Sequence, residues 1–145
     1  MQQLLQILVA GGDRRQQYAA QKLAESPQLS VTTIGFSQSD SETLPEFDVL
    51  VLPIHTTAES VPSKNGNLSL PELLSHVKKG GLVCGGVLPE AVCRMCQEQE
   101  LCFCDYFQRE ELCLANAVPT VEGAIQIAIS ERETVLCGSS VLVIG

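Results

Sequence analysis

The stretch LLQILVA at residues 4–10, followed directly by Gly11-Gly12, decides the fold class. A short run that is apolar at nearly every position is typical of a strand buried on both faces of a parallel sheet, and two glycines suit a tight turn at its end. A helix is expected next, because Asp13 can cap it, Gln16 follows at capping-box spacing and Pro27 prevents its continuation. The start of the chain therefore predicts a strand-turn-helix unit of an α/β domain.

The same alternation returns along the rest of the chain. Strand-like segments occupy residues 31–34, 48–52, 82–84 and 101–104, and helices are expected at 71–77 and 89–99. Strands that alternate with helices form parallel sheets through right-handed crossovers. The sequence predicts an α/β fold, a three-layer flavodoxin-like domain with a mainly parallel five-stranded sheet and a C-terminal interdomain helix.

That last helix is expected to begin at Pro119, with an apolar face repeating at helical spacing from Val121 to Ile129. After it, residues 140–144 have the character of a buried strand reaching the first glycine of a G-x-G-x-x-G dinucleotide fingerprint. We therefore expect residues 1–130 to form a flavodoxin-like substrate-side domain. Residues 131–145 would be a linker and the first strand of a truncated Rossmann domain, in which Gly145 contacts a nucleotide cofactor.

Composition and charge narrow the classes of function. The 145 residues are 45% hydrophobic, and nine basic against seventeen acidic residues give a net charge of −8 with no cluster of Lys or Arg, which argues against a nucleic-acid partner. The apolar runs at 4–10 and 49–54 are too short to span a membrane and the N-terminus has no secretory pattern, so a cytoplasmic protein without a membrane partner is expected.

The seven cysteines are expected to be reduced, inert and free of metal. Cys93 and Cys96 fall inside a predicted helix without the turn that a zinc knuckle uses, so they are assigned to core packing. Cys102 and Cys104 alternate on a predicted strand, which is the spacing of two further buried residues.

Candidate ligand-binding residues lie at the carboxyl ends of the predicted strands, where α/β sheets bind ligands. The backbone of Gly12 and the helix start at Asp13 favour a carboxylate or phosphate, and Arg14 could hold it as a bidentate clamp. Thr56 and Thr57 could donate uncharged hydrogen bonds. The alternative is that the glycines only form the turn, Asp13 only caps the helix and Arg14 is solvated.

One segment, NAVPTVEGAI at residues 116–125, together with residues 11–14 and 52–53, resembles the A subunits of dipicolinate synthase from spore-forming bacteria, and the resemblance extends over the whole chain. It implies an oxidoreductase-type enzyme of sporulation, in the mother-cell cytoplasm, that converts the lysine-pathway intermediate 4-hydroxy-tetrahydrodipicolinate to dipicolinate. NADP or NAD would be bound mainly by a C-terminal domain absent from this chain, which alone would be inactive.

The resemblance also implies partners and site residues. The partners are a flavoprotein-like B subunit, a small dicarboxylate substrate and, in a homo-oligomer, further copies of the chain. Asn116 and Thr120 would bind substrate. Glu122 in the first turn of the last helix could act as the catalytic base or orient a substrate amine, unless it only complements the helix dipole. His55 receives no role. The alternative function is a non-catalytic subunit-interaction or dimerisation module.

Overall fold

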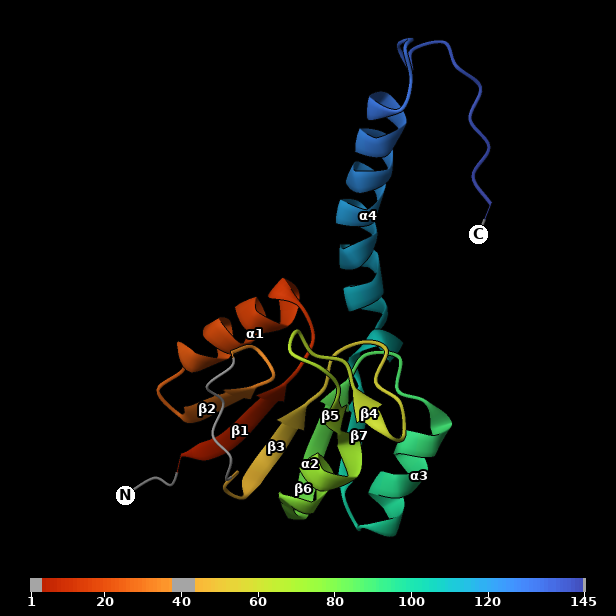
Figure 1. The fold of residues 1–145 in the computed structure, drawn as a ribbon. Helices are drawn as coiled ribbons and strands as arrows, with labels where there is room; N and C mark the ends of the chain where they lie inside the picture. Colours follow the sequence, from red (N-terminus) through yellow and green to blue (C-terminus); the bar gives the residue numbers. More distant parts are fainter. Residues whose placement is uncertain (1–3, 38–43, 145) are drawn as a thin grey trace. The chain divides into compact units, whose positions relative to one another are not determined.

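The structure is a computed structural model that describes residues 4–37 and 44–144, and it divides into two compact units at the junction of Gln108 and Arg109. The first unit contains a five-stranded sheet in the order β2-β1-β3-β6-β7 (Figure 1). All four strand pairs are parallel, which confirms the predicted sheet. The strands are β1 (Leu5–Ala10), β2 (Leu29–Ile34), β3 (Phe47–Val51), β6 (Val77–Gly85) and β7 (Cys102–Asp105).

Helices pack on both faces of this sheet and complete the predicted three layers. On one face, Ile7 and Val9 of β1 form a core cluster with Ala20 of α1 (Arg14–Ala24). On the other face, alternate strand residues such as Leu50 pack with the apolar side chains of α2 (Leu70–Ser75) and α3 (Glu90–Glu98). The strand period of two sends neighbouring residues to opposite cores.

The cap of α1 confirms one expectation and corrects another. The Asp13 carboxylate accepts the backbone N–H of Arg15 at 2.9 Å, so Asp13 is the N-cap. Gln16 does not complete a capping box. Its side-chain amide donates instead to the Val51 carbonyl at 3.4 Å and is almost fully buried, so this residue joins the helix to β3.

A small second sheet, which the sequence did not indicate, lies next to the glycine turn after β1. Strands β4 (Ser60–Val61) and β5 (Leu68–Ser69) pair antiparallel within the loop after β3. The N–H of Gly12 donates to the Pro62 carbonyl at 2.7 Å, next to β4. Gly11 has φ of +57°, and a Cβ there would collide with the same carbonyl, so only glycine suits this close approach.

The second unit contains one long helix, α4 (Glu110–Ser130), which follows the 3-10 turn η1 (Tyr106–Gln108). The helix therefore begins before Pro119, and the predicted start is wrong. Proline is accepted in the interior although it removes the N–H that would bond the Ala115 carbonyl. By length and composition α4, with a mean hydropathy of 1.4, is also the one helix in the described part of the chain that could cross a membrane.

The strand expected after this helix is not formed. Residues 131–144 contain turns, bends and irregular backbone, and the side chains of Val141 and Leu142 are exposed. A strand needs neighbouring strands for its backbone hydrogen bonds, and the described part of the second unit has none. Gly145, the expected cofactor contact, lies outside the described residues.

Candidate functional site

The carboxyl ends of β1, β3, β6 and β7 lie along one edge of the sheet, because these strands are parallel neighbours (Figure 1). The ends of β1 and β3 approach closely, since a Cβ on Gly12 would lie 2.9 Å from the Cβ of Pro53. The predicted residues Gly12, Asp13, Thr56 and Thr57 are thereby brought to the same edge. Their polar groups are, however, already engaged within the protein.

Local hydrogen bonds use the groups that were expected to contact a ligand. The N–H of Gly12 donates to Pro62, as described above. The hydroxyl of Thr56 is buried and donates to the Pro53 carbonyl at 2.9 Å. The hydroxyl of Thr57 accepts the N–H of Ser60 at 3.0 Å. These residues shape the loops of the edge.

Asp13 holds Arg15 in a two-pronged ion pair. The Nε of Arg15 lies 3.0 Å and its Nη2 2.7 Å from the Asp13 Oδ2. The hydrogen bonds from Arg15 hold the pKa of the Asp13 carboxyl below its ordinary value. Arg14, the arginine chosen from the sequence, is exposed and has no ion pair among the described residues. Arg15 is the better-oriented cation of this edge.

On the β7 side, Asp105 organises the loop that follows β6. Its carboxylate accepts three backbone N–H groups, from Val87 at 3.1 Å, Leu88 at 2.9 Å and Phe107 at 2.9 Å. One side chain therefore joins the end of β7 to the loop before α3. The same arrangement positions the residue that follows, Tyr106.

Tyr106 is half-buried over the end of β6. A Cβ on Gly86 would lie 2.7 Å from the Cε2 of its ring, so the glycine makes room for the ring. Burial raises the pKa of the Tyr106 phenol, and the nearby Arg15 guanidinium opposes that shift. The protonated phenol can donate a hydrogen bond, and it lies within electrostatic range of the Arg15 guanidinium. Two donors of this kind suit a carboxylate ligand.

Neither Arg15 nor Tyr106 was selected from the sequence. The sequence indicates Arg14 as the clamp for a ligand at the glycine turn, but in the structure Asp13 orients Arg15. Tyr106 was passed over because the end of the last strand was not counted among the ligand-facing loops. The rule that ligands bind at the carboxyl ends of strands applies to β7 as well as to β1. The position of Tyr106 directly after β7 is therefore a signal that the sequence contains.

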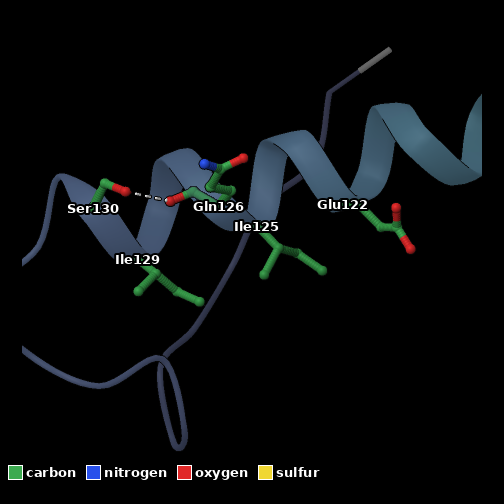
Figure 2. Close-up of a pocket in the computed structure, with 5 residues that line it drawn as sticks. All are labelled: Glu122, Ile125, Gln126, Ile129 and Ser130. Carbon is green, nitrogen blue, oxygen red and sulfur yellow. Dashed lines mark hydrogen bonds between the residues drawn. The ribbon is translucent and has the colours of Figure 1, made fainter.

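Three predicted residues belong to the second unit. Asn116, Thr120 and Glu122 lie in the interior of α4, and the Thr120 hydroxyl donates to the Asn116 carbonyl at 2.9 Å. Glu122 was expected in the first helical turn, which is wrong because α4 begins at Glu110. The dipole of the helix N-terminus therefore does not act on this carboxylate. Figure 2 shows it at one end of an open groove along α4, with Ile125 and Ile129.

Within residues 4–37 and 44–144, no three His, Cys, Asp or Glu side chains lie close enough together to hold a metal ion. Cys96 packs in the core as expected, and burial raises its pKa to about 11. Cys102 and Cys104 are exposed, so their assignment to the core is wrong. The spacing gave their common face correctly, but no described helix of the first unit covers it.

A parallel sheet of order 2-1-3-6-7 with helices on both faces defines an α/β domain of the flavodoxin-like class. Residues 6–107 match the family model described as the N-terminal domain of the dipicolinate synthase A subunit. The chain belongs to this family.

Relatives and solved structures agree with the match. The dipicolinate synthase A subunit of Bacillus subtilis (strain 168) is 29% identical over 160 residues, covering 97% of this chain and 53% of the relative. The crystal structure of the Bacillus halodurans A subunit has a TM-score of 0.79 at 22% identity and covers 94% of this chain and 52% of its own. The crystal structure of the Bacillus subtilis protein has a TM-score of 0.71 at 25% identity and covers 92% and 50%. The chain spans about half the length of these relatives.

Proposed function

We propose that this chain is the substrate-side, N-terminal part of a dipicolinate synthase A subunit, an oxidoreductase-type enzyme of sporulating bacteria. The proposed reaction converts 4-hydroxy-tetrahydrodipicolinate to dipicolinate in the mother-cell cytoplasm. Membership of the family and the names of the relatives support this assignment. A B subunit is the proposed partner on the same grounds.

The observation that supports a substrate role is that Arg15 and Tyr106 both lie at the carboxyl edge, within electrostatic range of each other. Asp13 fixes the guanidinium and Gly86 seats the phenol ring. A ligand with a carboxylate would receive a charge-assisted hydrogen bond from Arg15 and a neutral one from Tyr106. The substrate and product of the proposed reaction are both dicarboxylates, which matches this pair of donors.

A nicotinamide cofactor would supply the oxidation, but the described residues do not fit one. The nucleotide-binding turn expected near Gly145 has no strand before it, and residues 131–144 form no glycine-rich phosphate loop. The cofactor is therefore assigned to a part of the enzyme outside the described residues. The role proposed for this chain is to bind and orient the dicarboxylate.

The direct test is titration of the chain with dipicolinate by isothermal calorimetry or by NMR chemical shifts. Arg15→Ala should weaken binding by about tenfold to 150-fold, as expected for the loss of a charge-assisted hydrogen bond. Tyr106→Phe should weaken it by about two- to tenfold. Arg14→Ala is the matched control, with the same loss of charge one residue away, and should bind normally.

Each result has a definite meaning. An equal loss in Arg14→Ala and Arg15→Ala would show a general charge effect and reject the Arg15 site. Absence of binding by the unaltered chain would remove the substrate role from this unit. The full-length enzyme, assayed for dipicolinate formation in the presence of its cofactor and the B subunit, should show the same ranking in kcat/KM.

A further inference from the structure

Two cysteines lie side by side near the carboxyl edge of the sheet. The register of β6 with β7 pairs Cys84 with Cys104, and each stands one residue before the end of its strand. Paired residues of neighbouring parallel strands point to the same face, so the two thiols share one face of the sheet. Both strands belong to the first unit, and the closeness of the pair is therefore a property of that unit alone.

The spacing of the pair suits a disulfide. Neighbouring strands lie about 4.8 Å apart, and the Cα atoms of disulfide-bonded cysteines lie about 4.4–6.8 Å apart. Burial and, after it, the Cys104 thiolate raise the pKa of the Cys84 thiol, so the two thiols also lie within electrostatic range of each other. In the structure both are free thiols.

The other cysteines of the first unit are placed less well for such a bond. Cys102 pairs with Leu82 across the same two strands, and it lies about 6.6 Å from Cys104 by the rise of one strand. Cys93 and Cys96 lie within α3, and Cys96 is fully buried in the core. An oxidant reaches Cys96 only when that core opens.

The surroundings of the two thiols set the order in which they react. Cys84 is half-buried on a strand with neighbours on both sides, whereas β7, which carries Cys104, is the end strand of the sheet (Figure 1). The raised pKa of Cys84 lowers its thiolate fraction, and the thiolate is the form that attacks an oxidant. Cys104 is therefore expected to react first and Cys84 second.

Hydrogen peroxide balances the reaction. The Cys104 thiolate attacks one peroxide oxygen, the O–O bond breaks, and Cys104 becomes a sulfenic acid, while the other oxygen leaves as hydroxide and forms water with the proton that Cys104 lost. The Cys84 sulfur then attacks the Cys104 sulfur, and the S–O bond breaks as hydroxide leaves with the Cys84 proton as a second water. Two thiols are oxidised and one peroxide is reduced. A dithiol reverses the bond by thiol–disulfide exchange.

The residues that follow the pair form the edge proposed to bind a carboxylate. Asp105 and Tyr106 come directly after Cys104, and Gly86, which makes room for the Tyr106 ring, stands two residues after Cys84. The Tyr106 phenol also lies within electrostatic range of Cys84. A bond between the two strands therefore acts on the position of this phenol.

Closing the bond moves the strand ends. The Cβ atoms of a disulfide lie about 3.8 Å apart, whereas neighbouring strands lie about 4.8 Å apart. Within the sheet, β7 has a neighbouring strand on one side only, so it is the strand that can shift. The shift moves Tyr106, on the β7 side, relative to Gly86, on the β6 side.

We propose that Cys84 and Cys104 form a redox switch at this edge. An oxidant of the peroxide class joins their sulfur atoms in a reversible disulfide, which draws β7 toward β6 and weakens carboxylate binding at Arg15 and Tyr106. The disulfide rests on the register of the strands, whereas its effect on binding rests on the proposed function. The pair is an exception to the inert, reduced state expected for the seven cysteines.

The first test maps the disulfide. The chain is treated with hydrogen peroxide, the remaining thiols are alkylated, and the unreduced peptides are identified by mass spectrometry. A link between Cys84 and Cys104 is expected, and dithiothreitol should remove it. Cys102→Ser, on the same strand, is the matched control and should form the same link. In Cys84→Ser the reaction should stop at the sulfenic acid of Cys104, which dimedone traps.

The second test compares the binding of dipicolinate by the oxidised and the reduced chain, measured by isothermal calorimetry. The oxidised chain should bind about two- to tenfold more weakly, the range expected for the loss of one neutral hydrogen bond. Cys104→Ser cannot form the bond, so its affinity should not change after the same peroxide treatment. Circular dichroism checks that each variant is folded.

Each failure has its own meaning. Thiols that persist at Cys84 and Cys104 while other cysteines are oxidised, or a link from Cys104 to any other cysteine, would overturn the disulfide. Equal affinities of the oxidised and reduced chains would overturn the switch. Absence of binding by the reduced chain would instead reject the proposed substrate role, and the peptide map would then decide on the disulfide by itself.

Discussion

The carboxylate of Asp105 accepts the backbone N–H of Val87 at 3.1 Å, across the gap between β7 and the loop after β6. Val87 has φ of +56°, a conformation that is unfavourable for a β-branched residue. The hydrogen bond holds the loop in that conformation, and Tyr106 follows Asp105 directly. The loop at the edge that we propose to bind a ligand carboxylate is therefore held in place by the side-chain carboxylate of Asp105.

Two replacements of Asp105, by alanine and by asparagine, should destabilise the first unit to different extents. Asp105→Ala leaves three backbone N–H groups without their acceptor, and we expect a loss of about 2–3 kcal/mol in the free energy of unfolding. Asp105→Asn keeps Oδ1, which accepts from Val87 and Phe107, and should lose about half as much. Urea unfolding followed by circular dichroism measures both. Equal stability of all three proteins would show that the loop does not need this acceptor.

Val87→Gly should stabilise the same loop. Glycine removes a left-handed strain of about 1–2 kcal/mol and adds about 0.5–1 kcal/mol of chain entropy to the unfolded state. The net gain is expected to be up to about 1 kcal/mol, seen as a higher urea midpoint. Val87 is 60% exposed, so little burial is lost. Val87→Ala keeps the Cβ and should gain much less. A destabilised glycine variant would contradict the strain argument.

Periodicity predicted the fold well because the strands are local and continuous. The runs at 4–10 and 48–52 became central strands, and Asp13 became the cap of α1. Pro119 misled the prediction of α4, since proline usually begins or ends a helix, yet the apolar residues on both sides of it continue one helix. A prediction from local sequence signals does not compare the cost of one missing backbone hydrogen bond with the helix propensity and packing of all 21 residues of α4.

The site was harder to predict than the fold. Whether a side chain is available depends on contacts from distant segments, and Thr56 is unavailable because it turns back to Pro53. Arg15 is oriented by a carboxylate two residues away, and Tyr106 by a glycine at the end of another strand. The topology rule predicts binding at the carboxyl edge of the sheet, whereas the choice of residue on that edge depends on the three-dimensional arrangement.

Acid stability should depend on Asp48. Its carboxylate accepts Lys78 at 2.7 Å and the N–H of Gln6 at 2.8 Å, and these contacts, Lys78 first, lower the pKa of Asp48 below its ordinary value of 3.8. A lowered pKa in the folded state means that the stabilisation is complete above about pH 4 and is lost as the pH falls through the folded-state value.

Asp48→Asn should therefore cost about 1 kcal/mol at pH 7 and should flatten the loss of stability as the pH falls below about 4. Urea midpoints across that range measure the effect. Glu100→Gln, which removes an exposed ion pair with Lys79, is the control and should leave the acid dependence unchanged. An acid profile of Asp48→Asn that is identical to that of the unaltered chain would exclude Asp48 as a source of acid sensitivity.

The cysteines should differ sharply in reactivity. Cys96 is fully buried and burial raises its pKa to about 11, so about one thousandth of it is thiolate at pH 8. Cys137 is exposed. Alkylation of the native chain by iodoacetamide, followed by mass spectrometry of peptides, should modify Cys137 about 100-fold or more faster than Cys96. In urea the two rates should converge, because the core that protects Cys96 is then lost. Similar rates in the native chain would mean that α3 opens readily or that Cys96 does not lie in the core of the first unit.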